Sequence, residues 1–202
     1  MTCSGSAQYL IQSEDVLEHP DSWSRDGQYL LVSARSFSRA TGALGPNELS
    51  VWSFRDEKLT PLVKSVSTSD SARFSPDGHY VAYSSTESGR EEAWVTTFPD
   101  GRQKWQITHD GAKVRSWRAD GREILVATHA GELAVIPIST DGGFRAGALS
   151  VLVRGLGEDA GFAAAAPDHS RFLVKTMPAA ASASNEVHLW FNWTAGLART
   201  RR

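Results

Sequence analysis

Cysteine is nearly absent from this chain of 202 residues. The one thiol, Cys3, has no second cysteine to pair with, so the fold must be stable without an internal disulfide. The sequence also lacks a run of about 18 apolar residues, the length that a membrane-spanning helix needs, and we expect no membrane insertion. The first six residues have neither a basic nor an apolar segment, so no signal peptide is predicted. These features favour the cytoplasm, whereas a longer N-terminus with a signal peptide would indicate the periplasm.

An excess of charge of either sign is absent as well. The chain has 21 lysine and arginine residues against 23 aspartate and glutamate residues, a net charge of −2. Such a balance gives no general attraction for nucleic acid or an anionic membrane, and we expect no direct binding of nucleic acid. Hydrophobic residues make up 41% of the chain and seven are tryptophans, a composition that excludes a disordered protein.

Helical periodicity is almost absent, and one four-residue turn recurs instead between short apolar runs. Three clear copies and a divergent fourth are Ser24–Gly27, Ser75–Gly78, Arg118–Gly121 and Ala166–His169. Their aspartates are separated by 51, 43 and 48 residues: Asp26, Asp77, Asp120 and Asp168. A period in this range, built from short strands, is typical of propeller blades.

The residue types of the turn explain its shape. Aspartate at the third position and glycine at the fourth describe a type I turn followed by a residue in the left-handed region. Gly27, Gly78 and Gly121 adopt a positive φ at no steric cost. His169 takes this place in the fourth copy, where an L residue is less favourable, so we expect that corner to be the weakest. The aspartates and glycines are predicted to be structural turn residues rather than Ca²⁺ ligands.

A second regularity supports the repeat independently of the turn. The third strand of each unit begins with a glutamate followed by small or apolar residues at alternate positions. These glutamates are Glu48, Glu92, Glu132 and Glu186. At equivalent positions they form a candidate binding rim for cations or basic peptides. The alternative, which we favour, is a structural role in capping a strand edge or pairing with a nearby arginine.

These patterns predict an all-β fold, a single β-propeller domain over residues 1–202 with about four four-stranded blades. Such a domain is either a partial or a small propeller. The predicted blades cover 14–64, 65–109, 110–154 and 155–197, and residues 198–202 form a tail. Residues 8–11 are predicted to be a clasp strand that completes the last blade. The chain then forms an open or clasped arc, a four-bladed ring, or a larger ring by self-association.

The segment Phe74–Ser85 resembles the WD-repeat-like blade of TolB-type β-propellers. Trp117–Leu125 and the ending Phe191–Leu197 are similar to one bacterial subgroup in particular. Its members are C-terminal propellers fused behind a serine/threonine protein kinase or a winged-helix DNA-binding domain. The resemblance covers roughly residues 8–197 and implies a sensor, scaffold or interaction module without catalysis of its own. Propellers of this type usually have about six blades, so it also implies a larger bacterial signalling protein with a fused effector domain.

The sequence lacks the common catalytic patterns. The sequence has no kinase catalytic motifs and no Gly-x-Ser-x-Gly nucleophile elbow. The glycines from Gly155 to Gly161 have the wrong spacing for a phosphate-binding loop. The six histidines show no metal-type pairing. We therefore predict no catalytic residue, no cofactor and no metal site.

The predicted function is a non-enzymatic propeller that binds a protein or peptide partner as a sensor or scaffold. One alternative is a structural module for self-association. A third hypothesis is the propeller portion of a prolyl-oligopeptidase-like hydrolase, whose catalytic domain would lie outside this chain.

Overall fold

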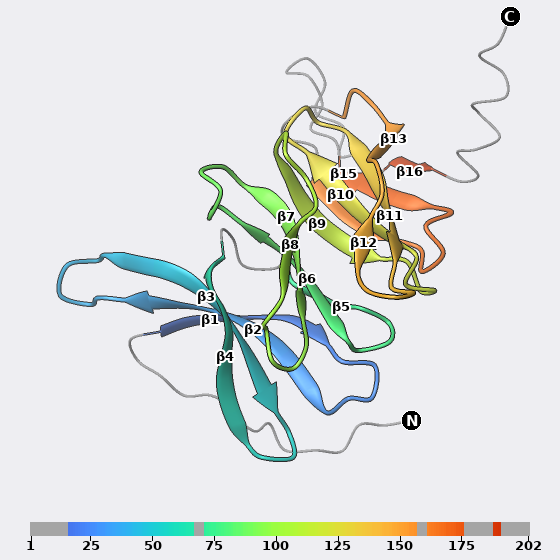
Figure 1. The fold of residues 1–202 in the computed structure, drawn as a ribbon. Coiled ribbons are helices and arrows are strands. Elements are labelled where there is room, and N and C mark those ends of the chain that lie inside the picture. Colours follow the sequence, from blue (N-terminus) through green and yellow to red (C-terminus); the bar gives the residue numbers. More distant parts are fainter. Residues whose placement is uncertain (1–15, 67–70, 157–160, 176–187, 191–202) are drawn as a thin grey trace, which may run out of the picture.

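The computed structural model describes residues 16–66, 71–156, 161–175 and 188–190. Within these ranges the chain forms sixteen strands and no helix, and all of the strand pairs are antiparallel. The predicted all-β fold is thereby confirmed. Figure 1 shows the strands gathered into successive small sheets, with the β1–β4 sheet and the β9–β13 sheet well separated in space.

The first two sheets each follow the predicted four-strand order. Blade 1 consists of β1 (Val16–Trp23), β2 (Tyr29–Phe37), β3 (Leu44–Ser53) and β4 (Lys58–Val66). Blade 2 consists of β5 (Arg73–Phe74), β6 (Tyr80–Ser85), β7 (Glu92–Thr97) and β8 (Lys104–Gln106). The pairing of Val66 with Ser85 joins these two blades into one continuous sheet.

The third blade has one additional short strand, and the fourth has three described strands. Blade 3 consists of β9 (Ala112–Trp117), β10 (Glu123–Thr128), β11 (Leu133–Ser139), the short β12 (Arg145–Ala146) and β13 (Ser150–Val153). Blade 4 has three described strands, β14 (Gly161–Ala165), β15 (Phe172–Lys175) and β16 (His188–Trp190). The predicted clasp strand, residues 8–11, lies outside the described residues.

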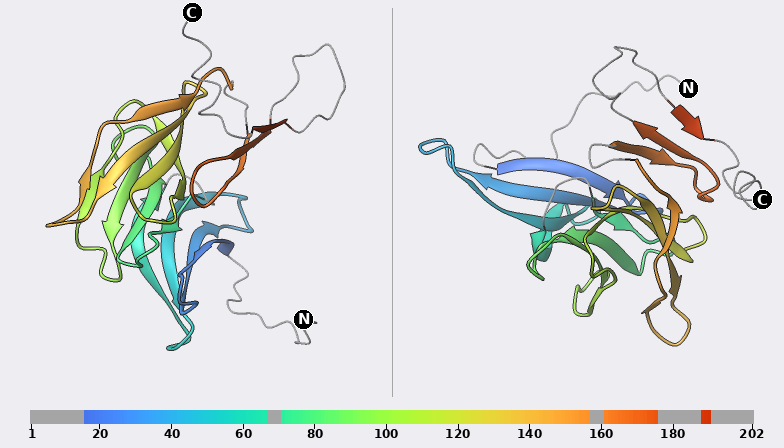
Figure 2. Two further views of the ribbon diagram at one scale, coloured as in Figure 1. Left: turned by 90° about the vertical axis from the view of Figure 1, so that its right-hand side faces the viewer. Right: turned by 90° about the horizontal axis from the view of Figure 1, so that it is seen from above.

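The hydrophobic cores lie between the blades because successive side chains of a strand point to opposite faces. Along β6, Val81 and Tyr83 pack in the core between blades 1 and 2, whereas Ala82 packs in the core between blades 2 and 3. In β10 the same alternation sends Leu125 toward blade 4 and its neighbours toward blade 2. Blades 2 and 3 are thus each held by two neighbours, as expected for a repeat structure. Figure 2 shows the sheets following one another in chain order.

Polar bonds also join the first strands of successive blades. Arg73 Nη1 donates to the Asp21 carbonyl oxygen at 3.2 Å, linking β5 to β1. Trp117 Nε1 donates to the Arg73 carbonyl oxygen at 3.2 Å, linking β9 to β5. The backbone N–H of Val114 donates to the buried Ser84 hydroxyl at 3.0 Å, and this bond connects β9 to β6. The first strands therefore have partners across the blade boundaries despite being the edges of their own sheets.

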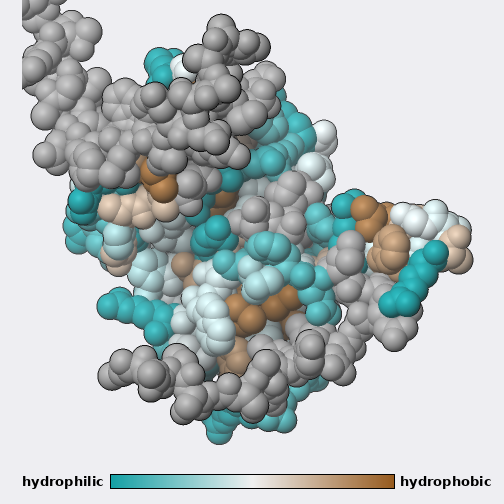
Figure 3. Space-filling view, turned by 180° about the vertical axis from the view of Figure 1, so that it is seen from behind, coloured by the Kyte–Doolittle hydropathy of each residue, from teal (hydrophilic) through white to brown (hydrophobic). Residues whose placement is uncertain are grey.

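Few large hydrophobic side chains are exposed among the described residues. They are Trp23, Leu44 and Leu149. Seen from behind, the coloured part of the surface has small hydrophobic areas that are interrupted by hydrophilic residues (Figure 3). None of the described residues belongs to a helix long and apolar enough to cross a membrane.

Candidate functional site

The corner aspartates of the first two blades serve the turn itself. Asp26 Oδ1 accepts hydrogen bonds from the Ser24 hydroxyl at 2.6 Å and from the Gln28 N–H at 3.0 Å. The Ser24 hydroxyl in turn accepts from the Tyr29 N–H at 2.9 Å. These hydrogen bonds, the one from Ser24 foremost, lower the pKa of Asp26 from its usual value.

Blade 2 repeats the same geometry. Asp77 Oδ1 accepts from the Ser75 hydroxyl at 2.5 Å and from the His79 N–H at 3.1 Å. Burial raises the pKa of Asp77, but these hydrogen bonds outweigh it and the net pKa is lowered. Gly27 and Gly78 have φ values of 71° and 73°, in the left-handed region that the turn requires.

Blade 3 replaces the serine of the corner by an arginine. Arg118 Nε and Nη2 each donate to Asp120 at 2.8 Å, one bond to each carboxylate oxygen. This pair, together with the Arg122 N–H, lowers the pKa of Asp120 to about 2. Gly121 has a φ of 73°, as in the other corners. The carboxylate therefore performs the same turn function with a different donor.

Blade 4 has the divergent corner. His169 adopts a φ of 55°, and its N–H donates to the Ala166 carbonyl oxygen at 2.9 Å as the glycines do in the other corners. Asp168 accepts from the Ser170 N–H and hydroxyl, which lowers its pKa. The histidine thus occupies the position that glycine occupies elsewhere. Whether this corner is the weakest of the four stays a prediction.

The His169 ring is a buried polar group between blades 3 and 4. Its side chain is 3% exposed, and Nε2 lies 3.0 Å from the Ser116 hydroxyl of β9. Nδ1 has no hydrogen-bond partner in the described part of the chain and lies 3.8 Å from Glu123 Oε2. Burial, and then the nearby Arg118 guanidinium, lower the pKa of His169 to about 4. The ring is therefore neutral near pH 7.

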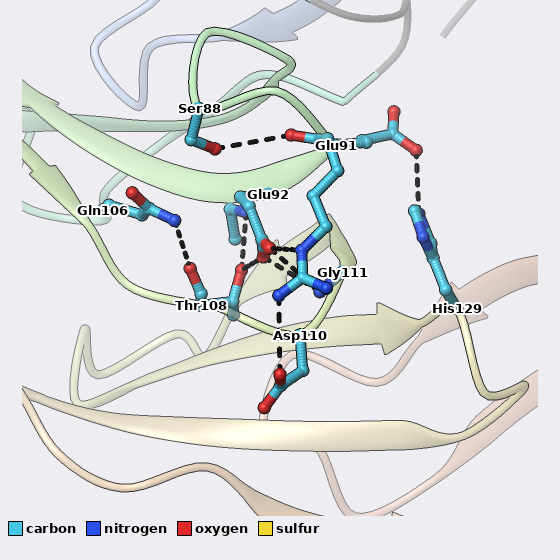
Figure 4. Close-up of polar contacts among 10 residues, drawn as sticks. Ser88, Glu91, Glu92, Gln106, Thr108, Asp110, Gly111 and His129 are labelled. Atoms are coloured by element: carbon cyan, nitrogen blue, oxygen red, sulfur yellow. Dashed lines mark hydrogen bonds and ion pairs between the residues drawn. The ribbon is translucent and has the colours of Figure 1, made fainter.

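Among the third-strand glutamates, Glu92 is almost completely buried, with 1% of its surface exposed. Arg90 Nε donates to its carboxylate at 2.6 Å, and so does the Thr108 hydroxyl at 2.6 Å. The Gly111 N–H donates to both of its oxygens at 3.0 and 3.1 Å. Figure 4 shows the Thr108 and Gly111 donors, which lie in one segment between β8 and β9, converging on the Glu92 carboxylate. Glu92 ties the segment between blades 2 and 3 to β7 and is not an exposed rim residue.

The other glutamates have different surroundings. Arg154 Nη1 donates to Glu132 Oε1 at 2.5 Å, and this pair lies near the surface. Glu48 is half-buried in β3, where it pairs in register with Ala34. Glu186 lies outside the described residues. The structure gives Glu92 and Glu132 arginine partners, and the binding-rim hypothesis stays a prediction.

A groove runs across the face on which the corners lie, and we call it the corner groove. It consists of two adjoining hollows with volumes of about 530 Å³ and 350 Å³. Both are lined by Arg25, Ser75, Pro76 and Ala119, so residues from blades 1, 2 and 3 meet there. The volumes lie in the range of ligand-binding clefts.

The larger hollow has mixed polar walls. Its further lining includes the corner carboxylates Asp77 and Asp120, and Arg122 beside the corner of blade 3. The end of β11 and the residues after it contribute Ser139, Thr140 and Asp141. The smaller hollow adds the Trp23 ring, which is 57% exposed and stacks on Phe54 at a centroid distance of 4.8 Å. Beside the groove, the Ala119 N–H donates to the Pro167 carbonyl oxygen at 2.7 Å and joins the corners of blades 3 and 4.

Sequence reasoning did not find the corner groove. The recurring turn places Arg25 in a corner and Trp23 in the strand before it, but it gives neither residue a role in binding. The signal that was available is the second corner position, where Arg25 and Ala119 differ from the prolines of blades 2 and 4. In the described part of the chain, no group of three or more His, Cys, Asp or Glu side chains is arranged to hold a metal ion.

The successive antiparallel blades and their corners define the fold as that of a β-propeller. The chain is similar to TolB from Acinetobacter baumannii, with a TM-score of 0.58 and 17% identity over 92% of this chain and 48% of that one. It is also similar to the β-propeller domain of the Trilobed protease from Pyrococcus furiosus, with a TM-score of 0.55, 11% identity, and 89% and 58% of the two chains covered. A third such structure is hydrazine synthase from Kuenenia stuttgartiensis, with a TM-score of 0.53 and 12% identity, covering 84% of this chain and 57% of that one.

At these identities the likeness concerns the fold alone. The chain spans about half the length of these solved structures. No family model matches the sequence. A short segment of 60 residues is 42% identical to Tricorn protease homolog 1 of Streptomyces coelicolor, which corresponds to 28% of this chain and 6% of that protein.

Proposed function

We propose that the chain is a non-enzymatic β-propeller module that binds a protein or peptide partner and acts as a sensor or scaffold. The observation that supports this proposal is the corner groove, which three successive blades build on one face. A groove assembled from several blades changes whenever one corner changes, so a repeat scaffold can vary its specificity there without altering its cores.

The hydrogen bonds of the corners support a non-catalytic role. Their aspartates have lowered pKa values and accept hydrogen bonds from neighbouring residues, so they are poor proton acceptors near pH 7. The candidate glutamate with the most extensive contacts, Glu92, is equally engaged within the fold. These carboxylates stabilise the fold, and the side chains of the corner groove remain available to bind a partner.

The finer proposal is that the module reports to an effector domain in a larger bacterial signalling protein. It rests on the resemblance of Phe74–Ser85, Trp117–Leu125 and Phe191–Leu197 to propellers that follow a kinase or a winged-helix domain. Purification of the natural full-length protein and measurement of kinase or DNA-binding activity test this part separately.

The experiment for the binding function uses a photo-cross-linking amino acid in place of Arg25, in the natural full-length protein within its own cells. The matched control carries the same amino acid in place of Arg39, beyond the far end of β2. We expect a defined partner to be cross-linked from position 25 alone, and the purified partner to bind the unmodified protein in calorimetry. Equal cross-linking from both positions, or turnover of a substrate by the chain itself, would contradict the proposal.

A second candidate function is that of a propeller portion of a peptidase. The 60-residue match to Tricorn protease homolog 1 favours it. The catalytic groups would then lie outside this chain, since no nucleophile elbow occurs in the sequence. Hydrolysis of fluorogenic peptides by the natural full-length protein distinguishes this function from the first.

A further inference from the structure

The two hollows of the corner groove contain cationic side chains without ionic partners. Arg25 lies in the corner of blade 1 and Arg122 lies immediately after the corner of blade 3; both are exposed. Neither guanidinium takes part in an ion pair or hydrogen bond with another described residue, although Arg122 is close enough to contribute to the lowered pKa of Asp120. A free guanidinium presents a planar fork of donors that matches the two oxygens of a carboxylate.

The carboxylates of the same walls have internal donors already. Asp120 accepts both bonds from Arg118, and Asp77 accepts from Ser75 and from the His79 N–H. Asp141 is the remaining carboxylate, and it is exposed at the rim. The main groups in the groove whose hydrogen-bond donors have no partner among the described residues are therefore the guanidinium groups of Arg25 and Arg122.

The smaller hollow supplies an apolar platform. The Trp23 ring is exposed, yet its stacking on Phe54 with an interplanar angle of 8° fixes its orientation. Phe74 and Pro76 line the same hollow beside it. A rigid aromatic surface loses little conformational entropy when a ligand covers it, and such rings are frequent anchors for peptides.

We propose that the corner groove binds an extended acidic peptide segment of a partner protein. Carboxylates of the segment pair with Arg25 and Arg122, and an apolar side chain between them packs on Trp23. This inference rests on the proposed binding function and adds the chemistry of the ligand and the residues that read it. Single-stranded nucleic acid would also use arginine and tryptophan, but with one phosphate per nucleotide it places more negative charge beside Asp77 and Asp141 than a segment with two paired carboxylates does. The oligothymidylate in the test below distinguishes the two ligands.

The test uses fluorescein-labelled peptides of about twelve residues in fluorescence anisotropy at about 50 mM salt. The first peptide alternates glutamate and glycine around one central phenylalanine. The second has glutamine in place of every glutamate, and the third has lysine. We expect only the glutamate peptide to bind, more weakly as salt is raised, because both charges in each pair are partly exposed to water. The intrinsic fluorescence of the protein should change on binding and should not change in Trp23→Ala.

The groove variants are Arg25→Ala and Arg122→Ala, and the matched control is Arg39→Ala on the hairpin at the far end of β2. Each groove variant should weaken binding by about five- to tenfold, the loss expected for one charge-assisted hydrogen bond at a partly exposed site. The control should bind as the unmodified protein does. All three side chains are exposed, and circular dichroism checks that each variant is folded.

Equal binding of the glutamine peptide, preference for the lysine peptide, tighter binding of an oligothymidylate, or no binding at about 1 mM protein would each overturn the inference. An equal loss in Arg39→Ala would overturn it as well. The proposed function has its own test in the cross-linking experiment. A partner cross-linked from position 25 whose binding is unaffected by loss of Arg25 and Arg122 would leave that function intact and reject the acidic-peptide chemistry.

Discussion

Glu92 carries its charge in a position with almost no exposed surface. Its four hydrogen bonds come from Arg90, Thr108 and the Gly111 N–H, which reaches both oxygens. Glu92→Ala leaves the Thr108 hydroxyl and the Gly111 N–H buried without an acceptor, so we expect a loss of about 2–4 kcal/mol in the free energy of unfolding. Urea denaturation measures it.

Glu132→Ala is the matched control for Glu92→Ala. Glu132 also begins a third-strand region and pairs with an arginine, but Arg154 is exposed to water. Its removal should cost less than about 1 kcal/mol. Equal losses in the two variants would show that the buried network does not stabilise the fold as its geometry indicates.

His169 makes stability depend on pH because its ring is buried and its pKa is about 4. The unfolded chain has a histidine pKa near 6.5, so it binds this proton more readily than the folded chain does. Stability is therefore complete above about pH 6.5 and falls as the pH decreases toward 4, by about 2–3 kcal/mol. Asparagine tolerates the positive φ, so His169→Asn should remain folded. The free energy of unfolding of this variant, measured by denaturation at pH 7 to 4, should decrease less with falling pH than that of the unmodified protein. An unchanged slope in His169→Asn would contradict the assignment of this pH dependence to the buried ring.

At the scale of one element, the corner depends on its backbone conformation more than on its side chains. A Cβ atom added at Gly78 would meet nothing within 4 Å, so any cost of substitution arises from its φ of 73°. We expect Gly78→Ala to lower the free energy of unfolding by about 1 kcal/mol and Gly78→Asn to cost clearly less. Thermal denaturation compares the two variants, and identical melting temperatures would contradict the conformational argument.

The elements themselves were predictable from sequence because each depends on neighbours along the chain. The turn residues, the apolar run after them and the glutamate-led third strand are all local signals. Their agreement with β2, β6, β10 and the later strands reflects that locality. The full length of the first strand is less apparent from the sequence, since β1 extends from Val16 to Trp23. Its earlier residues pair with the far half of the long β2, beyond the apolar run that follows the corner.

The corner groove could not be predicted in this way. Its walls come from three blades, and their approach depends on how the sheets pack and not on any one repeat. The burial of Glu92 likewise requires the segment after β8 to fold back over β7, an arrangement that the spacing of residues does not reveal. Local repeats thus specify the corners, and packing between blades decides which side chains remain exposed.

At the scale of the whole molecule, the blades are coupled through a small number of buried bonds. Ser84→Ala removes the hydroxyl that accepts the Val114 N–H and leaves that donor buried without a partner. We expect a loss of about 1–3 kcal/mol in the free energy of unfolding. Because the bond joins blades 2 and 3, hydrogen exchange should accelerate in both β6 and β9.

The control for this coupling is Ser53→Ala, in a turn within blade 1. It should change exchange only near residues 53–56. Acceleration confined to β6 in Ser84→Ala would mean that the two blades open independently of each other.

The bond from the Ala119 N–H to the Pro167 carbonyl oxygen joins one corner to the next. The equivalent position in the preceding corner is Pro76, whose nitrogen carries no hydrogen, so blade 2 cannot make the same bond to the corner of blade 3. Pro76 and Ala119 are shared by both hollows. The row of corners is therefore not bonded between blades 2 and 3, and no such bond is formed from Arg25 between blades 1 and 2. In a chain made of repeats, proline at this position removes the donor of one corner-to-corner bond, so single substitutions offer an evolutionary route to new binding surfaces on an unchanged core.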